Sequence, residues 1–109
     1  MPPGKPKNKD LQLIADIDRT LHAPARLMIL AMLHIVESAD FIFLMNQTGL
    51  TRGNLSTHLN KLEENKYIDI KKRFVGKKPR TLIRLTERGR SAIKNYRKNM
   101  RQVVDDLLE

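Results

Sequence analysis

The first part of the chain has two stretches with apolar residues at helical spacing. Between residues 10 and 21 the apolar positions are Leu11, Ile14, Ile17 and Leu21. This spacing predicts an amphipathic helix over residues 11–22 with Asp10 as its N-cap. Pro24 suits the first turn of a second helix, where a missing N–H does no harm. That helix is apolar on nearly all sides, so we expect it to lie buried at the centre of the core.

A strand stub and two helices are expected next. Phe41–Phe43 is too short for more than a strand stub, and residues 44–48 make a brief helical turn. Gly49 ends this turn, because glycine readily adopts the positive φ of a C′ position. Thr51 can cap the following helix, in which three leucines fall at i, i+4 and i+7. These are Leu55, Leu59 and Leu62. Two helices joined by a glycine turn predict a helix-turn-helix.

From Tyr67 onward the period of the pattern changes to two. Residues 67–73 and 81–86 alternate, and residues 75–80 between them predict a turn, so we expect a β-hairpin with a basic tip. A long helix follows from Glu87 to about Leu108, with Thr86 as its N-cap. Its apolar positions repeat at a 3-4-3-4 spacing and exceed what one small core can absorb. These positions are Ile93, Tyr96, Met100, Val103 and Leu107.

The predicted fold is mainly α with a small β-hairpin, in a single domain over residues 11–109. The chain has 109 residues, 40% of them hydrophobic, which suffices for one modest core. Residues 1–10 form a Pro-rich basic tail that we expect to be disordered. The absence of cysteine excludes disulfides, thiolate metal sites and cysteine nucleophiles. The longest apolar run has seven residues, whereas a membrane span needs about 20, so we expect a soluble cytoplasmic protein without a membrane partner.

The positive charge lies in one part of the chain. The formal net charge is +9, and residues 1–51 are neutral, whereas residues 52–101 hold sixteen basic and four acidic side chains. A one-sided field of this kind attracts a polyanion such as nucleic acid or an anionic membrane surface. A merely solvated basic surface would spread its charge more evenly.

The helix after Thr51 and the hairpin carry the candidate DNA-binding residues. Opposite the leucine stripe, the helix presents small or hydrogen-bonding side chains and no acidic ones. Asparagine can pair bidentately with adenine, and arginine or lysine suits guanine or phosphate. A hairpin arginine can enter a narrow minor groove. The alternatives are a solvated helix face and an edge hairpin that lysines protect from aggregation. The candidates are Arg52, Asn54, Ser56, Thr57, Asn60, Lys61, Arg73, Lys77, Lys78 and Arg80.

Ten short motifs between Ala39 and Tyr96 occur in a characteristic order. They are Ala39-Asp40-Phe41, Gly49-Leu50-Thr51, Gly53-Asn54-Leu55-Ser56, His58-Leu59, Leu62-Glu63, Tyr67-Ile68, Arg73-Phe74-Val75-Gly76, Pro79-Arg80-Thr81, Leu85-Thr86 and Gly89-Arg90. In this order the chain resembles the winged helix-turn-helix DNA-binding domains of the MarR and ArsR families of transcriptional regulators. The resemblance implies a winged-helix core over residues 23–86 and a dimeric, repressor-type regulator. It further implies that the second helix enters the major groove and the wing contacts the backbone or minor groove.

The chain departs from that group in two places. The helix that follows Thr51 is called the recognition helix below, because it corresponds to the helix that enters the major groove in that group. Lys66 follows this helix at a position where a glycine is common. The cysteine-bearing metal-sensing motif of many ArsR-type proteins has no counterpart, which excludes thiolate metal sensing.

No catalytic constellation is present. His22, His34 and His58 lie on three different segments without carboxylates at ligand spacing, so we expect packing roles, with His58 bracing the recognition helix. Ser56 lies two residues before His58 on one helix and points differently. There is no phosphate-binding glycine loop and no nucleophile elbow. We therefore expect no enzymatic activity, no cofactor and no metal.

The interpretation that these patterns favour is a sequence-specific double-stranded DNA-binding transcriptional regulator that acts as a homodimer and is associated with the nucleoid. The alternatives are an architectural DNA binder without base readout and a winged helix that serves only as a protein-interaction module. The patterns leave open whether a small molecule modulates binding; a dedicated ligand domain is not expected, and the alternative is a pocket at the dimer interface. The residues expected at the dimer interface are Leu11, Ile14, Tyr96, Met100, Val103, Val104 and Leu107.

Overall fold

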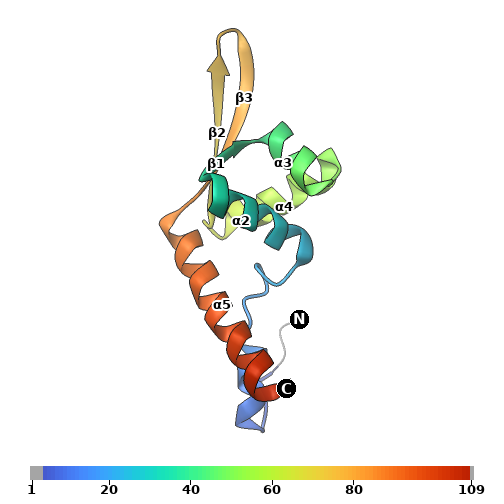
Figure 1. The fold of residues 1–109 in the computed structure, drawn as a ribbon, viewed down its shortest axis with the longest axis vertical. Helices are drawn as coiled ribbons and strands as arrows, with labels where there is room; N and C mark the ends of the chain where they lie inside the picture. The colour runs from blue at the N-terminus through green and yellow to red at the C-terminus, as the bar shows by residue number, and fades with distance from the viewer. Residues whose placement is uncertain (1–3, 109) are drawn as a thin grey trace.

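The computed structural model describes residues 4–108. Its elements follow the predicted order of helices and strands (Figure 1). They are a 3-10 helix at Lys9–Leu11, α1 (Gln12–Ala15), α2 (Pro24–Val36), β1 (Ser38–Asp40), α3 (Phe41–Thr48), α4 (Arg52–Glu64), β2 (Ile68–Val75), β3 (Lys78–Leu85) and α5 (Glu87–Leu107). The mainly α fold with a small hairpin is therefore confirmed.

The three strands form one antiparallel sheet in the order β1-β3-β2, with β3 in the centre. The strand stub expected at Phe41–Phe43 is wrong, because Asp40 instead caps α3 by accepting a hydrogen bond from the Phe43 N–H at 2.7 Å. The stub lies at Ser38–Asp40, where it pairs with β3. Its placement depends on this partner strand, which is distant in sequence.

The hairpin, residues 68–85, is called the wing below. Its two strands pair over eight positions, from Ile68 opposite Leu85 to Val75 opposite Lys78. The expected turn over residues 75–80 is therefore too long. Only Gly76 and Lys77 connect the strands, and Gly76 has a φ of 65°, the sign that a type II′ hairpin turn requires at its first central position.

The core lies where α2, α3 and α4 cover the base of the sheet. The leucine stripe of α4 is confirmed, since Leu55, Leu59 and Leu62 are at most 2% exposed. The other buried apolar side chains of this cluster are Leu21, Ile29, Leu30, Leu33, Ala39, Leu44, Ile68, Ile83 and Leu85. The predicted positive φ of Gly49, at 73°, is also confirmed.

The helix expected over residues 11–22 is wrong in length and in its cap. Helical structure covers only residues 9–15, and Asn8, not Asp10, caps it. The carboxylate of Asp18 accepts hydrogen bonds from the backbone N–H groups of Thr20 and Leu21, at 2.9 and 3.2 Å. A side chain that binds its own downstream amides favours a turn over a helix. The disordered tail expected over residues 1–10 is too long, because Lys9 and Asp10 already lie in the 3-10 helix. Residues 4–7 form no helix or strand, and residues 1–3 lie outside the described range.

Helix α2 begins at Pro24 as predicted, but it is not buried on all sides. Ile29, Leu30 and Leu33 face the core, whereas Met28 is 42% and Ile35 is 73% exposed. The helix packs on the sheet and on its neighbours with one face only, so part of its apolar surface remains in water.

Helix α5 extends away from the core, opposite to the wing (Figure 1). Thr86 caps it as predicted by accepting a hydrogen bond from the Gly89 N–H at 2.9 Å. Its far end contacts the N-terminal segment, where the Asn99 side-chain amide donates to the Leu13 carbonyl at 3.1 Å. The molecule is therefore elongated, with principal extents of 58 × 26 × 25 Å. Within the described range no helix is both long and apolar enough to cross a bilayer.

Candidate nucleic-acid interface

The recognition helix α4 exposes the expected polar face. Its N-terminus is fixed by the Thr51 hydroxyl, which accepts a hydrogen bond from the Asn54 N–H at 3.2 Å, as predicted. The buried leucines hold its inner face, so the opposite face points into solvent. Arg52, Asn54, Thr57, Asn60 and Lys61 are exposed there and Ser56 is half-buried. Five of the six candidates therefore lie away from the leucine stripe, whereas Arg52, three residues before Leu55, lies in line with the stripe at the exposed start of the helix.

Thr57 is exposed, but its hydroxyl group already makes a hydrogen bond within the helix. Its hydroxyl donates to the Gly53 carbonyl at 3.0 Å, so the hydroxyl proton is used within the helix. The oxygen still has acceptor capacity. Towards a base edge, Thr57 therefore acts as an acceptor, while Asn54 and Asn60 offer both donors and acceptors.

Two contacts that link α4 to neighbouring elements hold the helix in place. The Arg52 guanidinium lies 5.3 Å from the centroid of the Phe41 ring, a cation–π contact with α3. The Arg26 guanidinium of α2 lies 3.2 Å from Nδ1 of His58. Arginine can only donate, so His58 accepts with Nδ1 and carries its proton on Nε2. The predicted bracing role of His58 is confirmed, with Arg26 as a partner that the sequence did not reveal.

The C-terminal end of α4 is fixed by a chain reversal at Lys66. This residue has a φ of 62°, the left-handed conformation that glycine adopts most easily. The Tyr67 N–H donates back to the Leu62 carbonyl at 3.0 Å, which closes the helix end. The chain therefore takes the turn that a glycine would make, at the expense of some backbone strain.

Tyr67 connects this helix end to the N-terminal segment. Its hydroxyl donates to the carboxylate of Asp18 at 2.6 Å. Burial, reinforced by the hydrogen bond to Asp18, raises the pKa of Tyr67 to about 12. Burial and the Asp18 charge also raise the pKa of Tyr96. Both phenols are therefore neutral at physiological pH.

The backbone of α5 at Gly89 lies directly against the turn at Lys66 and Tyr67. A Cβ on Gly89 would collide with the carbonyl oxygen of Tyr67, so no other residue fits there without movement. The Thr86 hydroxyl donates to the Lys66 carbonyl at 2.6 Å, and the Thr86 N–H donates to the Tyr67 carbonyl at 3.1 Å. The end of α4 and the start of α5 are thus bound directly to each other.

The basic side chains of the wing lie on the exposed outer part of the two paired strands. Every residue from 71 to 80 is exposed. Arg73 lies directly opposite Arg80. Like charges at opposed positions destabilise a hairpin, and an anion between them would relieve the repulsion. The Asp40 carboxylate already lies near Arg80, so of the two it is Arg73 that suits a phosphate group.

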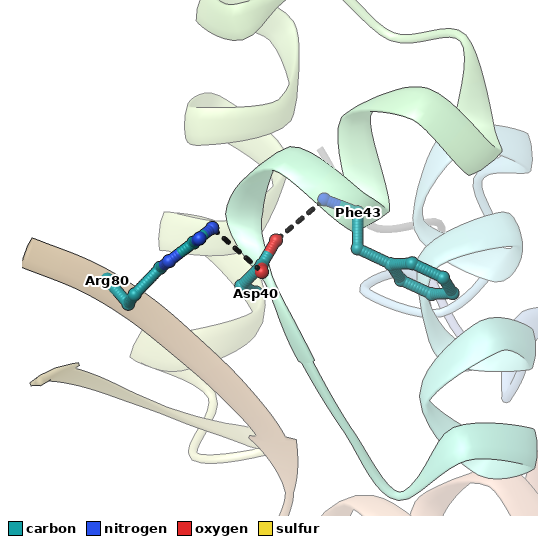
Figure 2. A network of polar contacts seen from close by, with 3 residues as sticks. All are labelled: Asp40, Phe43 and Arg80. Carbon is teal, nitrogen blue, oxygen red and sulfur yellow. Dashed lines mark hydrogen bonds and ion pairs between the residues drawn. The ribbon is translucent and has the colours of Figure 1, made fainter. Parts of the chain in front are cut away.

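Arg80 is not at the tip, where the sequence placed it beside Lys77 and Lys78. It lies in β3, and its guanidinium pairs with the carboxylate of Asp40 at 3.5 Å (Figure 2). Pro79, which was expected to stiffen the tip, also lies in the strand, opposite Phe74. The reason is the tight turn, which leaves only Gly76 and Lys77 outside the ladder.

Asp40 makes two contacts that the sequence analysis did not predict. One of its oxygens caps α3 and the other holds Arg80, so it links the helix-turn-helix to the wing (Figure 2). The signal in the sequence was an aspartate directly before an apolar run, which is an N-cap pattern.

The expected dimer residues differ in their exposure and form three groups. Leu11, Ile14 and Val104 are 47%, 41% and 51% exposed. Tyr96, Met100 and Leu107 are half-buried. Val103, by contrast, is only 2% exposed in the single chain, so the surplus apolar surface is smaller than the sequence suggested. The remaining six residues are called the apolar seam below.

The comparisons with known proteins agree with this geometry and define the class as a winged helix DNA-binding domain. The model of the winged helix DNA-binding domain family matches residues 25–104. The chain is 38% identical over 78 residues to the uncharacterized protein MJ0432 of Methanocaldococcus jannaschii, a match that covers 72% of this chain and 85% of that protein. The chain therefore belongs to the winged helix DNA-binding domain family.

Solved structures show the same fold. The transcriptional regulator homologue from Pyrococcus horikoshii OT3 is 29% identical, with a TM-score of 0.80 over 92% of this chain and 98% of that one. A MarR-family regulator from Silicibacter pomeroyi is 17% identical, with a TM-score of 0.63 over 90% of this chain and 68% of that one. An ArsR-family regulator also shares the fold. The resemblance to MarR and ArsR regulators is confirmed, and the family and fold are those of transcription regulators rather than enzymes.

Proposed function

We propose that this winged-helix regulator recognises a specific sequence in double-stranded DNA and acts as a homodimer. The observation that carries the proposal is the face of α4, which is polar, exposed and free of acidic groups from Arg52 to Lys61. The buried leucine stripe holds this face in one orientation. A helix of this shape enters the major groove with its N-terminal residues at the base edges.

The proposed contacts fall into two groups. Asn54, Ser56, Thr57 and Asn60 read base edges, because their side chains carry hydrogen-bonding groups on the face of α4 opposite the leucine stripe. Cations on α4 and the wing bind phosphates or the minor groove and set affinity rather than sequence. The cations are Arg52, Lys61, Arg73, Lys77, Lys78 and Arg80.

The experiment selects duplexes from a random pool and then measures binding of variants to selected and random DNA over a salt series. Asn60→Ala should cost about 1 to 3 kcal/mol on the selected site and little on random DNA, because a base-reading residue discriminates. Lys77→Ala and Lys78→Ala are the matched controls. Each should weaken all duplexes similarly and reduce the salt slope by about 0.9 for each phosphate that the variant no longer neutralises.

The outcome separates this proposal from its rival. If Asn60→Ala lowers affinity for selected and random duplexes by the same factor, the protein is an architectural DNA binder without base readout. If no duplex is bound at physiological salt, the winged helix serves as a protein-interaction module.

The homodimer is supported by the apolar seam. Leu11, Ile14 and Val104 remain exposed in the single chain, and a two-fold contact would cover them on both copies. Two recognition helices would then address half-sites about 34 Å apart. Sedimentation of the wild type should show a dimer at micromolar concentration. Val104→Asp should give a monomer, whereas Ile35→Asp, an exposed apolar position on α2, should remain a dimer.

A further inference from the structure

The wing carries an apolar group that the proposed contacts do not use. Phe74 is 76% exposed and Val75 is 64% exposed, although both lie in a paired strand. In the ladder Phe74 lies directly opposite Pro79, so the ring and the pyrrolidine share one face of the hairpin. Val75 lies on the other face, opposite Lys78.

This apolar pair of Phe74 and Pro79 lies among cations. Lys72 and Arg73 precede Phe74 directly, and Lys77 and Lys78 follow it around the turn. All four are exposed. Lysines alone would suffice to protect the edge strand from aggregation, and they give no reason for an exposed aromatic ring among them. The surface suits an occupant that is anionic at its edges and apolar inside.

A second copy of the chain at the apolar seam does not cover this group. The wing and the far end of α5 point to opposite ends of the molecule, whose longest extent is 58 Å (Figure 1). A dimer held through α1 and α5 therefore leaves Phe74 and Pro79 in water.

We propose that Phe74, supported by Pro79, is an apolar wedge that enters the minor groove of duplex DNA and partly unstacks a base step. This inference rests on the proposed DNA-binding function and adds a distortion of the DNA to it. The minor groove has phosphates along both edges and sugars and bases inside, which matches an apolar ring on a hairpin that carries cations on both faces, Lys72 on the face of the ring and Arg73 and Lys78 on the other. Apolar side chains that enter this groove separate base pairs and bend the duplex towards the major groove.

The wedge makes a prediction about sequence. Pyrimidine–purine steps such as TA and CA unstack most easily. A selected site should therefore prefer such a step where the wing lies, because of the ease of unstacking and not because of a hydrogen bond to a base. This preference should depend on Phe74 and not on Asn60.

The test uses the full chain and its selected duplex, with 2-aminopurine placed in turn at each step of the wing-side flank and a dye pair at the two duplex ends. Wild type should raise the 2-aminopurine fluorescence at one step and shorten the end-to-end distance. Phe74→Ala should abolish both signals and weaken binding about tenfold, the order expected when one aromatic ring no longer stacks on a base. Val75→Ala, on the opposite face of the same strand, should keep both signals. Phe74→Leu should keep part of the bend, because leucine is still an apolar wedge.

The proposal is overturned if wild type binds the selected duplex with neither signal, or if Phe74→Ala gives the wild-type signals. In both cases sequence-specific binding stands without the wedge. Absence of binding by the wild type itself would overturn the proposed function and the wedge together. Equal melting temperatures of wild type and Phe74→Ala show that the variant is folded.

Discussion

The recognition helix and the wing both carry basic and polar surface, but the fold holds them in opposite ways. Helix α4 buries three leucines and is fixed at both ends, by Thr51 and by the turn at Lys66. The wing is exposed at every position from 71 to 80 and is held there mainly by its backbone ladder. A rigid helix suits base reading, where small displacements break hydrogen bonds, and a compliant hairpin suits contacts to backbone and groove.

The largest expected effect tests whether the two regions differ in this way. Leu62 is fully buried, so Leu62→Ala should lower the free energy of unfolding by about 2 to 5 kcal/mol. Phe74→Ala removes a larger side chain from an exposed site and should change it by less than about 0.5 kcal/mol. Urea unfolding of both variants gives the comparison. Similar losses would mean that the wing is part of the core and not an independent extension.

The next effect concerns how firmly α4 is bound to α5. Gly89→Ala should lower the free energy of unfolding by about 1 to 3 kcal/mol, because the new methyl group collides with the Tyr67 carbonyl. Gly53→Ala is the matched control, since its Cβ would meet open space within α4. It should raise stability by about 0.5 to 1 kcal/mol through helix propensity. Thermal denaturation distinguishes the two variants. If Gly89→Ala leaves the free energy of unfolding unchanged, the backbone at the contact between Gly89 and Tyr67 can move to accommodate a methyl group.

A smaller effect should appear with pH. Because the pKa of Tyr67 is raised to about 12, the stability that its neutral phenol contributes is complete below pH 10 and is lost as the pH rises towards 12. Tyr67→Phe removes the hydrogen bond to Asp18 and should lower stability at pH 8 by about 1 kcal/mol. The loss of stability between pH 10 and 12 should become shallower but not vanish, because Tyr96 titrates in the same direction. Chemical denaturation at several pH values measures both.

The smallest effect concerns the turn that ends α4. Lys66→Gly should raise the free energy of unfolding by about 0.5 kcal/mol, because glycine adopts a positive φ without steric strain. The gain is small because glycine also loses more backbone entropy on folding than lysine does. Lys66→Ala is the control and should not stabilise. A loss of stability in Lys66→Gly would mean that the lysine side chain itself contributes to this end of the recognition helix.

Local patterns allowed most of the helix-turn-helix to be predicted. The caps at Thr51 and Thr86, the turn at Gly49 and the leucine stripe each depend on residues within a few positions of one another. The exposed face of α4 follows directly once the buried stripe is known. For these elements, intrinsic preferences and tertiary packing agree.

The elements that could not be predicted depend on distant partners. Residues 16–21 leave the helix because Asp18 forms a turn and binds Tyr67, 49 positions away. The strand stub lies at Ser38–Asp40 because β3 is there to pair with it. The contact of Arg80 with Asp40 spans 40 positions and gives no periodic signal in the sequence.

The free end of the wing also has a consequence for how such proteins diverge. The residues from Lys71 to Arg80 are all exposed, and the ladder closes through the two-residue turn of Gly76 and Lys77. Inserting two residues in each strand keeps every side chain on its face, whereas inserting one exchanges the faces. The reach of the hairpin can therefore change in steps of about 7 Å while the core remains as it is. Changes near Gly76 and Lys77 alone are therefore enough to alter how far the wing extends from the core.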